Sequence, residues 1–281
     1  MTLLAPAKLN LALHLGERRE DGLHELRSLF CPLALADRLV LEDAEGEADE
    51  VACPSVAGPN LATVALEALR ARGWRRAPLR VEIDKRIPLA AGLGGGSADA
   101  AALLRLARGE LDGLPEVAAG LGADVPSQLT PRFAFVSGAG EIVEPLPAPA
   151  DFGLVLIPDE AGLETAAVYR EADALGLSRD ATELDQLGVR LREAASTGAS
   201  PLAYAALLVN DLEQAAISLR PGIAEALGAL EEVGAARALV TGSGPTAFGL
   251  FEDIVAADAA ASALPPRYAN AIVTTPGGLR S

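Results

Sequence analysis

A glycine-rich segment between a predicted strand and a predicted helix constrains this chain more than any other feature. Four of five consecutive residues are glycines: Gly92, Gly94, Gly95 and Gly96. Glycine allows positive φ and lets backbone N–H groups approach a ligand without a Cβ in the way. Residues 79–84 alternate like a strand, and Ser97 is a good N-cap for a helix over 98–107. Free N–H donors and the helix dipole would both face such a loop, so we expect it to bind phosphate; a flexible turn is the alternative.

The loop matches neither of two common phosphate-binding motifs. The dinucleotide fingerprint G-x-G-x-x-G needs a third glycine where this chain has Ser97, and the P-loop needs a lysine that is absent here. Anion stabilisation at a helix terminus contributes only about 0.3–2 kcal/mol. A nucleotide at this loop must therefore be held by several amides together with a metal ion and side chains.

Composition predicts a globular protein. Half of the residues are hydrophobic, as in globular proteins. The length of 281 residues is enough for one large domain or two ordinary ones. Three prolines, Pro145, Pro147 and Pro149, indicate a boundary near residue 150 and hence domains over 1–150 and 151–281. Two cysteines give no disulfide or metal framework, and we find neither a signal-peptide pattern nor an apolar run long enough for a bilayer. We therefore expect a cytoplasmic protein with no membrane contact.

The charge balance limits the classes of ligand. A formal net charge of −16 argues against nucleic-acid binding, which depends on neutralised phosphates. An anionic substrate must be held by a local positive site against this field. Only two of the 23 basic residues are lysines, Lys8 and Lys85. These positions favour a compact ammonium over the planar fork of arginine.

Three segments carry candidate polar groups around the loop. Residues 7–15 alternate strictly, so Lys8 and Asn10 lie side by side on one strand face, although a single such face is more often solvated. His24 follows an Asp-Gly turn, and a lone histidine, like His14, is more often structural. Asp124 lies in a turn between Gly122 and Pro126, where it could also simply bond local backbone.

The remaining pattern mixes strands and helices and predicts an α+β protein. We expect strands or strand pairs over 28–41, 133–146, 152–157, 237–251 and 268–275. We expect helices over 61–72 (capped by Asn60), 111–121, 165–175, 183–195, 201–219, 223–233 and 254–264. The second glycine turn, 241–246, also faces the ligand in this interpretation.

Six motifs occur together in the order of a known family. They are Ala5-Pro-Ala-Lys-Leu-Asn-Leu, Asp21-Gly-Leu-His, Ile87-Pro-Leu-Ala-Ala-Gly-Leu-Gly-Gly-Gly-Ser-Ala, Gly122-Ala-Asp-Val-Pro, Asn210-Asp-Leu-Glu and Thr241-Gly-Ser-Gly. From Ala5 to Phe251 the chain resembles the GHMP kinase superfamily. Within it, the chain resembles the branch that phosphorylates 4-CDP-2-C-methyl-D-erythritol in the non-mevalonate isoprenoid pathway.

The resemblance implies a two-domain α+β GHMP kinase fold with the site in the cleft between the domains. It implies ATP-dependent phosphorylation of the 2-hydroxyl of a small cytidyl-diphosphate alcohol, with Mg²⁺ and with no protein metal ligand assigned. The catalytic pair would be Lys8 and Asp124, with Asp124 as base and Lys8 keeping it ionised. The ATP loop would comprise Pro88, Leu89, Ala90, Ala91, Gly92, Leu93, Gly94, Gly95, Gly96, Ser97 and Ala98. The substrate residues would be Asn10, His24, Thr165 and Tyr169, in a monomer or homodimer.

The chain departs from the family pattern near the substrate. Leu23 stands where the family usually has tyrosine. If that ring stacks on the base, an aliphatic side chain replaces one aromatic wall of the base pocket, and the lost stacking costs about 1–3 kcal/mol of binding free energy. Tyr169 could supply the other wall. Ser127 and Gln128 follow the Asp124 motif where apolar or aromatic residues are frequent. Two alternatives stay open at this point: a sister kinase for homoserine or mevalonate, and a catalytically silent binding protein with the same fold.

Overall fold

The computed structural model describes all residues except 57, 59, 160 and 279–281. Its first sheet has the order β3-β4-β2-β5-β6, with β1 paired to β2. The strands are β1 (Thr2–Arg18), β2 (His24–Asp43), β3 (Glu50–Ala52), β4 (Leu79–Asp84), β5 (Ala134–Gly138) and β6 (Ile142–Pro145). All pairs are antiparallel except β3 with β4.

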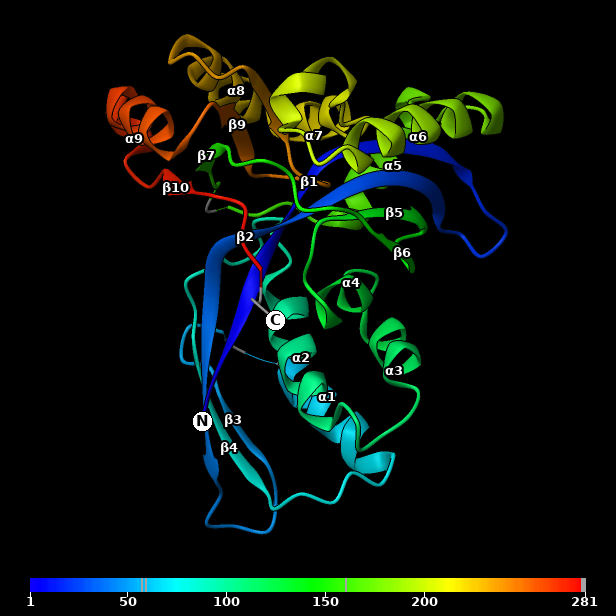
Figure 1. Cartoon of the computed structure of the whole chain (residues 1–281), viewed down its shortest axis with the longest axis vertical. Coiled ribbons are helices and arrows are strands. Elements are labelled where there is room, and N and C mark those ends of the chain that lie inside the picture. Colours follow the sequence, from blue (N-terminus) through cyan, green and yellow to red (C-terminus); the bar gives the residue numbers. More distant parts are fainter. Residues whose placement is uncertain (57, 59, 160, 279–281) are drawn as a thin grey trace.

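The second sheet is antiparallel throughout and has the order β10-β7-β9-β8. Its strands are β7 (Gly153–Ile157), β8 (Arg237–Val240), β9 (Ala247–Phe251) and β10 (Ile272–Thr274). The β1–β2 pair, drawn in blue, runs from the lower to the upper half of the molecule (Figure 1). Register shifts at bulges interrupt this pair, and bulges bend a strand.

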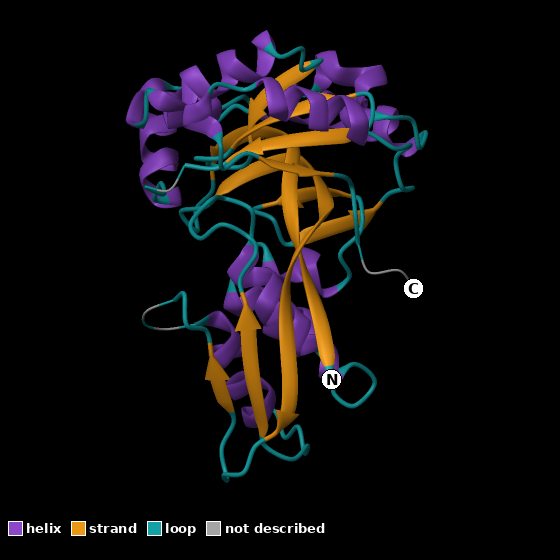
Figure 2. Ribbon diagram, turned by 90° about the vertical axis from the view of Figure 1, so that its left-hand side faces the viewer, coloured by secondary structure: helices purple, strands orange, loops and turns teal. Residues whose placement is uncertain are grey.

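Helices cover both sheets. The first half holds α1 (Leu61–Ala71), α2 (Gly95–Leu104), α3 (Leu114–Leu121) and α4 (Val125–Leu129). The second half holds α5 (Thr165–Leu175), α6 (Ala181–Ser196), α7 (Glu213–Leu219), α8 (Gly222–Glu232) and α9 (Ile254–Ala263). The helices of the second half gather at the top of the molecule, and those of the first half lie lower, beside the long strands (Figure 2). No helix among the described residues combines the length and the apolar character that a bilayer crossing requires.

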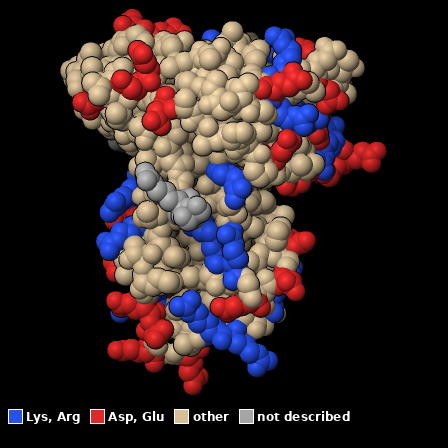
Figure 3. Space-filling model, in the orientation of Figure 1, with Lys and Arg blue, Asp and Glu red and all other residues tan. Residues whose placement is uncertain are grey.

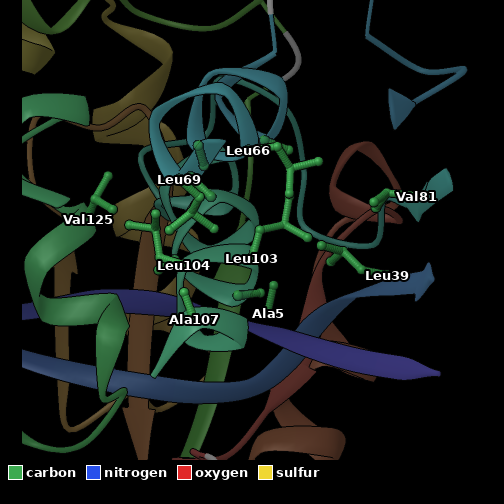
Figure 4. Close-up of a cluster of buried hydrophobic side chains, with 14 of the residues drawn as sticks. Ala5, Leu39, Leu66, Leu69, Val81, Leu103, Leu104, Ala107 and Val125 are labelled. Atoms are coloured by element: carbon green, nitrogen blue, oxygen red, sulfur yellow. The ribbon is translucent and has the colours of Figure 1, made fainter. Parts of the chain in front are cut away.

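The core of the first half fixes the helix that follows the glycine loop. As predicted, Asn60 caps α1, accepting a hydrogen bond from the Ala62 N–H at 2.9 Å. Figure 4 shows that apolar side chains of α1 and α2 meet each other and side chains of β2 and β4. Fully buried members include Leu66, Leu69, Leu103, Leu104, Leu39 and Val81. Because α2 is buried from Ala98 to Leu104, its first turn, residues 95–97, starts from a fixed helix.

The two halves share a second hydrophobic cluster. It combines Leu9 and Leu29 of the first sheet with Leu154 and Phe248 of the second and with Phe152, which directly precedes β7. No strand crosses residue 150, since β6 ends at Pro145 and β7 begins at Gly153. The division into domains over 1–150 and 151–281 nevertheless stays a prediction.

Two predicted elements are wrong. The segment 28–41 is not a strand pair but part of the single strand β2, which β1 accompanies along its whole length. The helix predicted over 201–219 is interrupted between a 3₁₀ helix at Pro201–Leu207 and α7. The Leu13 N–H donates to the Val209 carbonyl at 2.8 Å, and the Asp211 N–H donates to the Leu13 carbonyl at 2.9 Å. This strand-like pairing with β1 outweighs the local helical pattern.

Candidate active site

A cavity of about 740 Å³ is lined by residues from both halves of the chain. It brings together every residue for which the sequence predicts a catalytic or substrate role: Lys8, Asn10, His24, Asp124, Thr165 and Tyr169. The glycine loop contributes Gly92, Gly94 and Ser97. Residues that the chain separates widely therefore meet in one place.

The charges around the cavity differ from those of the whole chain. Its lining contains the cations Lys8, Arg18 and Arg170 and the carboxylates Asp124 and Asp173. The surface elsewhere mixes both signs, with acidic side chains prominent at the two ends of the face seen in Figure 3. A modest local excess of positive charge therefore exists within a protein of net charge −16.

Lys8 is buried and held in place by its strand neighbour. Its ammonium donates to Asn10 Oδ1 at 2.7 Å and lies 5.0 Å from the centroid of the Phe30 ring. The Asn10 amide in turn donates to Ser28 Oγ at 2.8 Å. Only 7% of Lys8 and 3% of Asn10 is exposed, so the interpretation of a solvated strand face is wrong. Asn10 thus orients Lys8, and its predicted contact with substrate stays a prediction.

Asp124 completes an ion pair with Lys8. The distance from Lys8 Nζ to Asp124 Oδ2 is 3.2 Å, and a third of the aspartate side chain is exposed. The segment after it is a helix rather than an open turn, because Val125 begins α4 and Pro126 fits its first turn. The Asp124 side chain makes no capping hydrogen bond, so the alternative of a backbone-bonding aspartate is wrong. The contact recorded for the carboxylate is its ion pair with the Lys8 ammonium.

The glycine loop starts its helix earlier than the sequence predicts. Gly94 takes the left-handed conformation at φ 69° and occupies the N-cap position, so α2 begins at Gly95. The predicted cap at Ser97 is therefore wrong, and Ser97 lies in the first turn with the cavity beside it. The first N–H groups of a helix have no partner within it. The Ala98 N–H, however, already donates to the Gly94 carbonyl at 2.9 Å.

The other predicted loop residues do not line the cavity. They are Pro88, Leu89, Ala90, Ala91, Leu93, Gly95, Gly96 and Ala98. Ala91, Leu93 and Ala98 are buried in the hydrophobic clusters, where their side chains hold the loop in shape. Ala90 has φ 52°, and it is the one non-glycine with positive φ among the described residues. Contacts of these residues with a nucleotide stay a prediction.

A buried ionic cluster anchors both ends of the loop. The Lys85 ammonium donates to Asp37 of β2 and, at 2.8 Å, to Asp99 Oδ2 of α2. Asp37 Oδ1 also accepts from the backbone N–H groups of Arg86 and Ile87 at 2.6 and 2.8 Å. Burial raises the pKa of Asp99 to about 7 although Lys85 opposes this shift. The two carboxylates raise the pKa of Lys85 despite its burial.

The second glycine turn touches the glycine loop. Thr246 Oγ1 donates to the Ala91 carbonyl at 2.7 Å, and the Asn10 N–H donates to Thr241 Oγ1 at 2.8 Å. Gly242 and Ser243 line the cavity, as the sequence predicts for this turn. Segments from both halves of the chain therefore meet at the glycine loop.

Replacing Gly92 with alanine is expected to separate these two turns. Gly92 has φ +74°, and its Cβ would lie 2.5 Å from the Gly244 carbonyl oxygen, a distance that only a backbone shift can relieve. We expect the variant to lose about 1–3 kcal/mol of unfolding free energy and to bind ATP more weakly. Urea unfolding and calorimetric ATP titration measure the two effects. The control is Gly120→Ala, since Gly120 lies in α3 with nothing within 4 Å of its Cβ. Equal behaviour of the two variants would contradict the close-contact argument.

His24 and Tyr169 line the cavity with neighbouring rings. Their ring centroids are 5.2 Å apart and their planes are tilted by 36°. Burial, and then the charge of Asp124, raises the pKa of the Tyr169 hydroxyl to about 12, so this phenol stays neutral. Thr165 Oγ1 lies 3.0 Å from Ser243 Oγ and joins α5 to the second glycine turn. Leu23 also lines this end and is 54% exposed.

Sequence reasoning missed two residues of this site. Phe30 lies under the Lys8 ammonium, and Asp173 Oδ1 is 2.7 Å from His24 Nε2. A signal for Asp173 was present, because Thr165, Tyr169 and Asp173 follow at intervals of four and so share one face of α5. Phe30 gives no comparable signal, since its place beside Lys8 depends on the register between β1 and β2.

Comparisons with known proteins identify the family. The model described as GHMP kinases N terminal domain matches residues 60–125, and GHMP kinases C terminal matches residues 191–270. A 4-diphosphocytidyl-2-C-methyl-D-erythritol kinase of Methylobacterium radiotolerans is 42% identical over 288 residues, covering 94% of this chain and 95% of the relative. The kinase of the same name from Paracoccus denitrificans is 40% identical over 261 residues, covering 91% and 89%.

Solved structures agree with these relatives. The crystal structure of a 4-(cytidine 5'-diphospho)-2C-methyl-D-erythritol kinase matches with a TM-score of 0.81 and 38% identity, over 99% of this chain and 100% of that one. A homoserine kinase from Cytophaga hutchinsonii matches with a TM-score of 0.74 over 99% and 94% of the two chains, and at 19% identity it shows the fold alone. The resemblance that the motifs indicate is confirmed. The chain belongs to the GHMP kinases and, within them, to the family of the 4-diphosphocytidyl-2-C-methyl-D-erythritol kinases.

Proposed function

We propose that this protein transfers the γ-phosphoryl group of ATP to the 2-hydroxyl of 4-CDP-2-C-methyl-D-erythritol in the non-mevalonate route to isoprenoid precursors. The products are ADP and the 2-phosphate. The observation that carries the proposal is the Lys8–Asp124 pair, 3.2 Å apart, in the cavity that also contains the glycine loop and the His24–Tyr169 end. The names of the relatives supply the acceptor alcohol.

The mechanism follows from the needs of phosphoryl transfer, which are alignment, charge stabilisation and a route for the proton. The acceptor oxygen forms a bond to the γ-phosphorus while the bond from that phosphorus to the ADP oxygen breaks. The hydroxyl proton passes to the Asp124 carboxylate. The Lys8 ammonium, fixed by Asn10, balances the negative charge at Asp124 and at the attacking oxygen.

The donor set of the cavity fits a magnesium nucleotide. Mg²⁺ prefers oxygen ligands and usually binds through one or two protein groups together with substrate phosphates. Ser97 and Asp124 provide a hydroxyl and a carboxylate in the lining of the cavity. We assign Ser97 to the nucleotide side, next to the ion. When bound, Mg²⁺ would offset the charge of the phosphates during transfer.

Phosphorus NMR tests the proposed function directly. Purified protein, ATP and Mg²⁺ are mixed in separate samples with 4-CDP-2-C-methyl-D-erythritol, mevalonate and homoserine. We expect ADP and a new phosphomonoester signal with the cytidyl alcohol alone. A phosphomonoester from mevalonate or homoserine, with none from the cytidyl alcohol, would overturn the proposal. ATP binding without transfer to any alcohol would favour a silent binding protein. Cytoplasmic location and a monomeric or homodimeric state remain part of the proposal.

A further inference from the structure

A buried asparagine holds the backbone of the second glycine turn. Asn210 opens the motif Asn210-Asp-Leu-Glu, and its side chain is 5% exposed. Its Nδ2 donates to the carbonyls of Val240 and Gly242, both at 2.7 Å, and its Oδ1 accepts from the Leu212 N–H at 3.0 Å. Because a carbonyl only accepts and a backbone N–H only donates, an amide side chain is the group that satisfies all three partners.

The same asparagine is attached to β1, the strand that carries Lys8. Backbone hydrogen bonds of 2.8 and 2.9 Å join the residues on either side of Asn210 to Leu13. The carboxylate of Asp211, the next residue, accepts from the Leu15 N–H at 2.9 Å. The amide of Asn210 therefore has a fixed position relative to β1, and it transmits that position to the turn.

The turn leaves little room beside the Lys8 ammonium. A Cβ on Gly242 would lie 3.0 Å from Asn10 Oδ1 and 3.6 Å from Lys8 Nζ. Asn10 Oδ1 is the atom that accepts the hydrogen bond from Lys8, and the Asn10 N–H donates to Thr241 Oγ1 of the same turn. Gly242 therefore borders the contact that keeps the ammonium within 3.2 Å of Asp124.

We propose that Asn210 is a positioning residue for phosphoryl transfer, and that it acts by holding Gly242 beside the Lys8 ammonium. Asn210 lies outside the lining of the active-site cavity and lines a second cavity of about 430 Å³ instead. It therefore acts through the main chain of the turn and touches no substrate. This inference deepens the proposed function and rests on it.

The structure separates an effect on transfer from an effect on ATP affinity. Asn210 bonds to the beginning of the turn, at Gly242, whereas the glycine loop is bonded to its far end, where Thr246 Oγ1 donates to the Ala91 carbonyl. A misplacement of about 1 Å at a reacting group can lower a rate by about 10²-fold. We therefore expect loss of the amide to lower kcat by about 10- to 100-fold and to change the Kd for ATP by less than about threefold.

Two variants remove the amide in different ways. Asn210→Asp keeps an acceptor for the Leu212 N–H but cannot donate to the two carbonyls. Asn210→Ala removes every side-chain bond without adding a charge, and the adjoining cavity lets water reach the carbonyls, so this variant carries the test if the aspartate prevents folding. The matched control is Asn270→Asp, because Asn270 is exposed and donates to the Pro158 carbonyl at 3.4 Å. Steady-state kinetics and calorimetric ATP titration should give wild-type values for this control.

Lysine NMR shows whether the ammonium has moved. The chain contains two lysines, so protein labelled with ε-¹³C-lysine gives two signals. The Lys8 ammonium lies 5.0 Å from the centroid of the Phe30 ring, whose ring current makes the Lys8 signal sensitive to small displacements. Lys85, in the ionic cluster with Asp99, is the internal reference. We expect the Lys8 signal to move in the folded Asn210 variants and the Lys85 signal to stay.

The outcomes separate this inference from the proposed function. A folded Asn210 variant with the kcat and the Lys8 signal of the wild type overturns the positioning role alone. A loss confined to the Kd for ATP also overturns it, and so does a change in both lysine signals, since that would show a general loosening of the protein. Absence of phosphoryl transfer by the wild-type protein overturns the proposed function, and this inference with it.

Discussion

Asp124→Asn is expected to abolish phosphoryl transfer while ATP still binds. The amide has nearly the shape of the carboxylate but cannot take the proton of the acceptor hydroxyl. It also leaves the Lys8 ammonium without its anionic neighbour at 3.2 Å. A general base contributes about 10²–10⁴-fold to a rate, so we expect kcat to fall by at least about 10²-fold. The variant should fold, because a third of the Asp124 side chain is exposed and, although Asp124 is the N-cap residue of α4, its side chain makes no capping hydrogen bond.

The measurement compares steady-state kcat with the calorimetric Kd for ATP. Asp112→Asn is the control, since it removes the same charge from an exposed loop before α3. We expect this control to match the wild type in both quantities. Activity of Asp124→Asn within about tenfold of the wild type would show that another group takes the proton.

Lys85→Met is expected to cause the largest loss of stability. The ammonium is 7% exposed and pairs with two aspartates, of which Asp37 is 0% and Asp99 2% exposed. Without it, the pKa of Asp99, already about 7 beside Lys85, rises further, so Asp99 must take up a proton on folding and Asp37 loses its cationic partner. Removing one partner from a buried pair costs about 3–5 kcal/mol. Because this cluster holds both ends of the glycine loop, ATP binding should weaken as well.

Denaturant unfolding of three variants tests this expectation. Arg86→Met removes the same charge from the next residue, whose surface pair with Asp84 is half exposed, and should change stability by less than about 1 kcal/mol. Lys85→Met combined with Asp99→Asn should recover part of the loss, because a neutral amide replaces the carboxyl that would otherwise have to take up a proton on folding. Similar stabilities of Lys85→Met and Arg86→Met would contradict the cluster's role.

The sequence predicted the fold class and a set of residues that meet in one cavity, and it predicted some single elements wrongly; the roles of the site residues stay predictions. Lys8, Asp124 and His24 lie in short motifs whose residue types and spacing carry chemistry, and all three line one cavity. Each residue taken alone gives a weaker indication of function, since a polar strand face is more often solvated and a lone histidine is more often structural. It was the order of several motifs along the chain that decided between these alternatives.

The misses have physical causes that a local helical pattern does not contain, and the first of them is long-range pairing. The break at 208–212 arises because residues 209–211 pair with Leu13, almost two hundred residues earlier in the chain. The Asn210 amide reinforces it by donating to the carbonyls of Val240 and Gly242, both at 2.7 Å. The start of α2 at Gly95 likewise depends on the left-handed conformation of Gly94. Local helix propensity contains none of this information.

The contact between the two glycine turns has a consequence for how such an enzyme can diversify. The approach of Gly92 to Gly244 is made by main chain, and the Thr246 hydroxyl bonds to the Ala91 carbonyl beside it, so the residues that hold the two turns together are not the ones proposed to bind the base. Substitutions at cavity-lining residues away from this junction, such as Leu23, can then accumulate without moving the two turns. Enzymes with this fold can therefore change the residues that line the rest of the cavity, and with them the acceptor alcohol, while the two glycine turns keep their positions.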